Sequence, residues 1–121
     1  MLGTVLKNKN QYPVNIHKAY HAHVYFDNHS LEFAKTLSNQ AGKMFGLEIG
    51  RVHQKPIGPH PMWSCQILFS CSQFDELIAW LDNNRQDLSI FVHPLTGNDI
   101  LDHTEYAYWL GDSVELNLKG L

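Results

Sequence analysis

The sequence lacks a cluster of basic side chains. Nine Lys and Arg stand against twelve Asp and Glu in 121 residues, which gives a net charge of −3. Proteins that bind nucleic acids neutralise phosphates with grouped Lys and Arg side chains. The charge distribution therefore argues against a nucleic-acid partner.

Long apolar runs are absent as well, and cysteine is scarce. A membrane helix needs roughly 18 consecutive apolar residues, and no run approaches that length. The opening stretch MLGTVLKNKN has no apolar core of the kind found in secretory signals. Cys65 and Cys71, the two cysteines, are expected at one strand and its end, too far apart to form a disulfide. These features predict a cytoplasmic protein with reduced thiols and no membrane partner.

The chain does have enough apolar side chains for one hydrophobic core. Its hydrophobic fraction is 44% over 121 residues, which is ordinary for a single globular domain. Residues 1–17 are polar and contain Pro13, so we expect a flexible lead-in there. Residues 18–121 are expected to form one domain without repeats.

Alternating apolar and polar residues predict strands over 18–26, 47–54, 62–69 and 88–93, and the stretch SVELNL (113–118) is expected to add a short fifth strand. Two helical stripes lie between them. The first contains Ala34, Leu37, Ala41 and Met44 or Phe45 and ends at Gly46; the second follows a cap at Ser72 and contains Phe74, Leu77, Ile78 and Leu81. The order βαββαβ predicts an α+β, ferredoxin-like sandwich, with both helices on one face of an antiparallel sheet.

Histidine is unusually frequent, with eight residues, and its placement is informative. In the stretch YHAHVYF, His21 and His23 are two residues apart, so both point to one face of the first strand. The usual strand order 4-1-3-2 makes that strand central. Antiparallel pairing then brings His93 near His21 on the face opposite the helices. It also brings His60 near His23 if the third strand extends back to His60. Four imidazoles are expected to converge.

A single histidine on an open sheet face is more often a solvated polar residue, and a register slip of one residue would scatter the set. Converging neutral imidazoles suit Zn, Fe, Ni or Cu. His103 is a further ligand or a general acid/base, while Arg51 and His53 on the second strand are candidates for lining the rim. Three carboxylates are possible additional ligands, with ordinary turn and cap roles as the alternative: Asp99, Asp102 and Glu105.

Three stretches together resemble the DOPA 4,5-dioxygenase-like family. They are YHAHVYFD, KPIGPHPMWSCQILF and VHPLTGNDILDHTEYAYWLG, and the likeness extends over roughly residues 18 to 118. The resemblance implies a dimeric non-haem iron enzyme of ferredoxin-like fold. Such an enzyme opens the ring of a catechol, such as DOPA, by extradiol cleavage with dioxygen.

On that basis we expect Fe(II) as the cofactor, although Zn or Ni can occupy an imidazole site in a crystal. The expected metal ligands come from His21, His23, His60 and His93. The expected acid/base is His103 or the histidine left over from that set, with His23 as a candidate. The expected substrate-binding residues are Arg51, His53 and Tyr106; Tyr106, Tyr108 and Trp109 are alternatively core or dimer-interface residues.

Two rival hypotheses keep the fold without the chemistry. One is a non-catalytic dimeric domain that binds a metal or a small molecule. The other is a dimerisation module whose histidine face is buried against a second subunit.

Overall fold

A five-stranded antiparallel sheet organises the molecule. The computed structural model describes residues 11–121, so most of the predicted lead-in, residues 1–10, lies outside the described residues. The strands are β1 (Ala19–Phe26), β2 (Glu48–His53), β3 (Trp63–Ser70), β4 (Ile90–Pro94) and β5 (Tyr108–Leu110). Their order is β2-β3-β1-β4-β5. The predicted arrangement of the first four strands is confirmed, with β1 at the centre, and β5 extends the sheet beyond β4.

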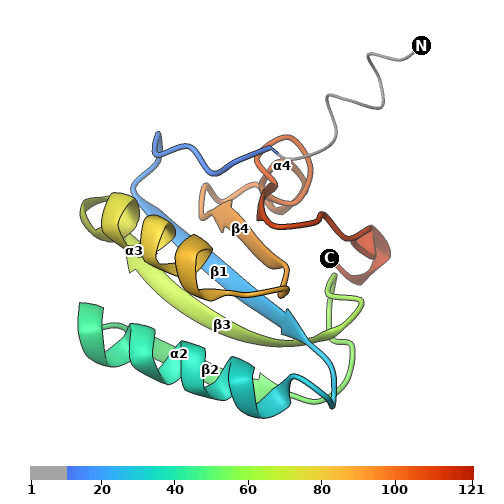
Figure 1. The fold of residues 1–121 in the computed structure, drawn as a ribbon. Coiled ribbons are helices and arrows are strands. Elements are labelled where there is room, and N and C mark those ends of the chain that lie inside the picture. Colours follow the sequence, from blue (N-terminus) through green and yellow to red (C-terminus); the bar gives the residue numbers. More distant parts are fainter. Residues whose placement is uncertain (1–10) are drawn as a thin grey trace.

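The two long helices lie side by side on one face of this sheet (Figure 1). They are α2 (Leu31–Phe45) and α3 (Cys71–Asn84). Their apolar stripes meet the inward-facing side chains of β1 and β3, which alternate along each strand. Ala22, Val24 and Ile67 are fully buried in this main core. In the last turn of α2, Phe45 packs beside Trp80, whereas Met44 is exposed.

Helix α3 begins earlier than predicted. Its N-cap is Ser70, not Ser72, because the side chain of Gln73 accepts a hydrogen bond from the Ser70 backbone N–H at 3.0 Å. The same side chain donates to the carbonyl of Phe45 at 3.1 Å. Gln73 therefore provides a hydrogen-bond acceptor for the backbone N–H at the start of α3, and it also links α3 to the end of α2 by a hydrogen bond.

Replacing Gln73 with alanine is expected to lower the free energy of unfolding by about 1–2 kcal/mol, because the hydrogen bonds of its side chain to Ser70 and to the Phe45 carbonyl are lost. Urea denaturation measures the change. Glu76→Ala, an exposed substitution on the same helix, is the control and should stay within about 0.5 kcal/mol of the parent. Equal effects from the two variants would contradict the capping role.

The predicted fifth strand is wrong in position. In SVELNL (113–118), residues 113–117 are irregular and Leu118 begins a short 3-10 helix, η1 (Leu118–Gly120), while the strand that pairs with β4 is Tyr108–Leu110. All three residues of β5 are buried, so burial against the sheet selects this short aromatic segment. After β5 the chain crosses to the other face, where Val114 and Leu116 pack on a second apolar cluster of Tyr25, Phe91 and Trp109.

The far end of the chain reaches the connection between β2 and β3 (Figure 1). The backbone N–H of Asn117 donates to the carbonyl of Pro59 at 2.8 Å. Gly120 lies so close to Gly58 that a Cβ there would meet the Gly58 carbonyl. The face opposite the helices is therefore partly covered. Across residues 11–121, no helix has the length and apolar character needed to cross a membrane.

Candidate metal centre

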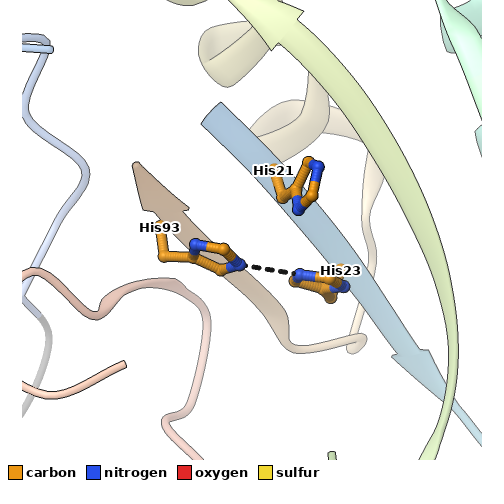
Figure 2. Close-up of side chains that lie close together, drawn as sticks. All are labelled: His21, His23 and His93. Atoms are coloured by element: carbon orange, nitrogen blue, oxygen red, sulfur yellow. Dashed lines mark hydrogen bonds between the residues drawn. The ribbon is translucent and has the colours of Figure 1, made fainter. Parts of the chain in front are cut away.

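Three histidines converge on the face of the sheet opposite the helices (Figure 2). His21 and His23 come from β1, and His93 comes from β4. The register places His93 directly opposite His21, while His23 stands opposite Phe91. Because side chains alternate along a strand, this register brings all three imidazoles to one side. Each offers one ring nitrogen, and the three nitrogens lie within 4.8 Å of one another.

The spacing of these nitrogens fits one metal ion. Nε2 of His23 and Nε2 of His93 are 3.0 Å apart. Metal–imidazole bonds of about 2.1 Å place two ligands on neighbouring octahedral positions about 3 Å apart. Three imidazoles on one side of an ion leave its remaining positions open. The residues present therefore fit a catalytic type of metal site.

Backbone carbonyls orient two of the rings. Nδ1 of His93 lies 2.8 Å from the carbonyl of Pro94, and Nδ1 of His103 lies 2.8 Å from the carbonyl of Asp99. A carbonyl only accepts, so each Nδ1 carries a proton, and the lone pair of either ring in its neutral form is at Nε2. This is the arrangement that second-shell partners give to metal-binding histidines.

Burial keeps the cluster neutral. Loss of solvent, followed by the neighbouring histidines, holds the pKa of His23 well below its usual range. The same two causes, against the opposing hydrogen bond to Pro94, lower the pKa of His93 to about 4. Burial, and then His103, also lowers the pKa of His21. Neutral imidazoles are the form that binds metal ions, so the electrostatics prepare these rings as ligands.

His60 reaches the cluster by a route that differs from the predicted one. Strand β3 begins at Trp63, so it does not extend back to His60; a turn closed by an isolated bridge between Ile57 and His60 carries the ring instead. The centroids of the His60 and His23 rings are 4.1 Å apart. Burial, and then His103, lowers the pKa of His60 to about 4. His60 is outside the set of three converging nitrogens.

His103 completes a cluster of five imidazoles. It follows α4 (Asp99–Asp102), and its ring centroid lies 4.4 Å from that of His93. The ring also borders a pocket of about 390 Å³ formed with Trp109 and Val114. His103 therefore lies between the candidate metal triad and this pocket.

A second pocket borders the triad at His23. It has a volume of about 260 Å³ and is lined by His23, His53, His60, Ser64, Gln66 and the Ile57–Pro59 turn. His53, which the sequence analysis proposed for the rim, lines this pocket. His23 is the member of the triad that lines this pocket.

Other predicted residues are elsewhere. Arg51 is exposed on β2 and lines neither of these two pockets. Tyr106 packs on the main core and against His17, at a ring distance of 4.9 Å, away from the triad. Tyr108 is in the main core, and Trp109 is in the second cluster. These two are core residues, one of the alternatives considered above.

The three candidate carboxylates do not join the converging nitrogens. Asp102 is buried, but its two oxygens accept hydrogen bonds from the backbone and hydroxyl of Thr96, at 3.0 and 2.6 Å. Asp99 and Glu105 are exposed. Asp102 therefore has the ordinary turn role considered above, because its hydrogen bonds to Thr96 close the turn before α4.

Two residues around the cluster were not singled out from the sequence. The hydroxyl of Tyr25 lies 2.8 Å from Nδ1 of His60. The ring of Phe91 stacks on His23, with centroids 5.6 Å apart. The alternation of side chains along β1 and β4 could have identified both, because Tyr25 is two residues after His23 and Phe91 is two before His93, so both lie on the histidine face.

Comparison with known proteins agrees with this geometry. The sequence profile of the Dopa 4,5-dioxygenase family matches residues 20–120. The DOPA 4,5-dioxygenase of Amanita muscaria is 35% identical over 113 residues, which are 86% of this chain and 50% of that protein. An uncharacterised 21.2 kDa protein of Botryotinia fuckeliana is 36% identical over 116 residues, covering 86% of this chain and 63% of that one. The chain thus spans about half to two thirds of the length of these relatives.

A crystal structure of a candidate dioxygenase from Nostoc punctiforme has the same fold. Its TM-score against this chain is 0.82, with 43% sequence identity over 85% of this chain and 90% of that one. Both the sequence and the arrangement of the elements therefore point to one group of proteins.

Proposed function

The chain belongs to the Dopa 4,5-dioxygenase family, and from this premise we propose that it opens a catechol ring with dioxygen by extradiol cleavage. The observation that carries the proposal is the convergence of three histidine nitrogens within 4.8 Å on one side of the sheet. DOPA or a related catechol is the proposed substrate, and Fe(II) is the proposed metal. Membership of the family supports the reaction type, and the donor set supports the metal.

His21, His23 and His93 would hold the metal. When bound, Fe(II) supplies a site at which a catecholate and dioxygen meet and exchange electrons. The carbonyl of Pro94 fixes the His93 ring with its unprotonated Nε2 toward His23. Because β1 and β4 are hydrogen-bonded neighbours, the ligands are held on rigid backbone.

Proton handling would fall to the histidines around the triad. A catechol must lose protons to bind as a catecholate, and a base within reach accelerates that step. The Asp99 carbonyl accepts from Nδ1 of His103, which leaves Nε2 as the nitrogen that would take up a proton, and the ring lies beside His93, so His103 is the proposed base. The pocket of His23, His53 and His60 is the proposed substrate site, because it borders the triad at His23.

The test is an oxygen-consumption assay. The protein is loaded with Fe(II) without air, mixed with DOPA or a simpler catechol, and then exposed to air. We expect uptake of one dioxygen per catechol and a yellow ring-opened product. Protein loaded with Zn(II), which does not change oxidation state, is the control and should form none. Bound iron without oxygen uptake across a panel of catechols would instead favour the non-catalytic metal-binding domain.

The oligomeric state is a separate proposal. A homodimer is expected from the family resemblance, and exposed apolar side chains at Leu68, Leu95 and Leu118 are compatible with a protein partner. Analytical ultracentrifugation at micromolar concentration tests it. Sedimentation as a monomer would reject the dimer without affecting the metal site.

A further inference from the structure

Tyr25 is a buried phenol connected to the histidine cluster. It is 1% exposed, and its hydroxyl lies 2.8 Å from Nδ1 of His60. Its ring packs edge-on against Trp109 in the second apolar cluster, with centroids 5.9 Å apart. Across residues 11–121, the hydroxyl has no other hydrogen-bond partner.

This isolation fixes the direction of the bond. If Nδ1 of His60 were protonated and donated to the phenol oxygen, the phenol proton would be buried without an acceptor, which costs about 1–3 kcal/mol. The phenol therefore donates to Nδ1. The neutral ring of His60 must then carry its own proton on Nε2.

The ring of His60 is thus in the opposite tautomer to the neutral rings of His93 and His103. Pro94 and Asp99 accept from Nδ1 of His93 and His103, so the neutral form of each of those rings has its lone pair at Nε2. The ring of His60 instead presents an N–H group at Nε2. A protonated nitrogen is not a metal ligand, and His60 is indeed outside the triad of converging nitrogens.

We propose that Tyr25 is a positioning residue that holds His60 out of the metal-ligand set as the Nε2–H tautomer, where His60 donates a hydrogen bond to an oxygen atom of the substrate. The inference rests on the proposed function for the identity of that substrate. The position of His60 supports it, because His60 lines the 260 Å³ pocket beside His23. A hydrogen-bond donor at this place stabilises negative charge on a substrate oxygen.

Long-range ¹H–¹⁵N NMR of the histidine rings tests the tautomer directly. The His60 signals are identified as those missing from the spectrum of His60→Ala. In the Zn(II)-loaded parent we expect the Nε2–H tautomer at His60. Tyr25→Phe should shift those signals toward a mixture of tautomers. Tyr108→Phe, another buried phenol but one in the main core, should leave them unchanged.

Metal affinity and turnover provide the second readout. His60→Ala and Tyr25→Phe should keep the affinity for Zn(II) within about threefold in a chelator competition, because the triad is intact. Tyr25→Phe should lower kcat for the catechol about tenfold while KM is unchanged. An Nδ1–H tautomer in the parent, or loss of metal from His60→Ala, would overturn the inference. If no catechol is cleaved, the proposed function fails, and the tautomer and metal affinity still decide this proposal.

Discussion

Replacing His21 with alanine is expected to lower metal affinity by more than about 100-fold and to abolish ring opening. Loss of second-shell partners alone typically costs 10–100-fold in metal-binding proteins, so loss of a direct ligand costs more. His21 is partly exposed at its place on β1, so its removal leaves a small cavity and the fold is retained. Metal content after dialysis and chelator competition measure the first effect, and oxygen uptake measures the second.

His29→Ala is the matched control. His29 is an exposed histidine in the turn between β1 and α2, outside the cluster, so this variant should bind metal like the parent. The far-UV circular dichroism of both variants should match that of the parent. Equal metal content in His21→Ala and the parent would reject His21 as a ligand, and the triad with it.

Most of the triad can be predicted from the sequence, because side chains alternate regularly between the two faces of a β-strand. Alternation in YHAHVYF assigns His21 and His23 to one face with no further information. His93 follows from the phase of β4 and from the antiparallel order of a common fold. These inferences needed the correct register, and the apolar partners Ala22 and Val92, which pair in the core, specify it.

The backbone path that brings His60 to the cluster could not be predicted from strand alternation. The segment KPIGPHP contains three prolines and a glycine, so no regular period extends into it. Its path depends on a left-handed Gly58 and on the close approach of Gly120, more than fifty residues later. Long-range backbone contacts of this kind leave no local pattern. The sequence therefore predicted that His60 approaches His23, but not how.

The cover over the histidine face was also missed. β5 has three residues, which is too short for a period of two to be recognised, and SVELNL resembles a strand better than Tyr108–Leu110 does. The sequence pattern consequently does not predict that Trp109 and Leu116 pack against Tyr25 and Phe91. This cover removes solvent from the cluster and so produces the lowered pKa values of its histidines. The electrostatics of the site therefore depend on the part of the fold that was hardest to predict.

Acid is expected to destabilise the metal-free protein through the same histidines. The pKa of His93 falls from its ordinary 6.5 to about 4 on folding. Between these values the unfolded chain binds more protons than the native protein, so the free energy of unfolding decreases as the pH decreases. His93 alone accounts for about 2 kcal/mol at pH 5 and about 3 kcal/mol below pH 4. His23 and His60 act in the same direction.

Urea denaturation of chelator-treated protein between pH 7.5 and pH 5 measures this loss. His93→Gln replaces the titrating ring with an amide, so its stability should fall by about 2 kcal/mol less than that of the parent over the same interval. The slope against pH is the readout, because the substitution also changes the stability at pH 7.5. Equal slopes in the two proteins would mean that His93 is protonated as readily in the folded chain as in the unfolded one. Burial would then not keep the ring neutral, and it would not prepare His93 to bind a metal.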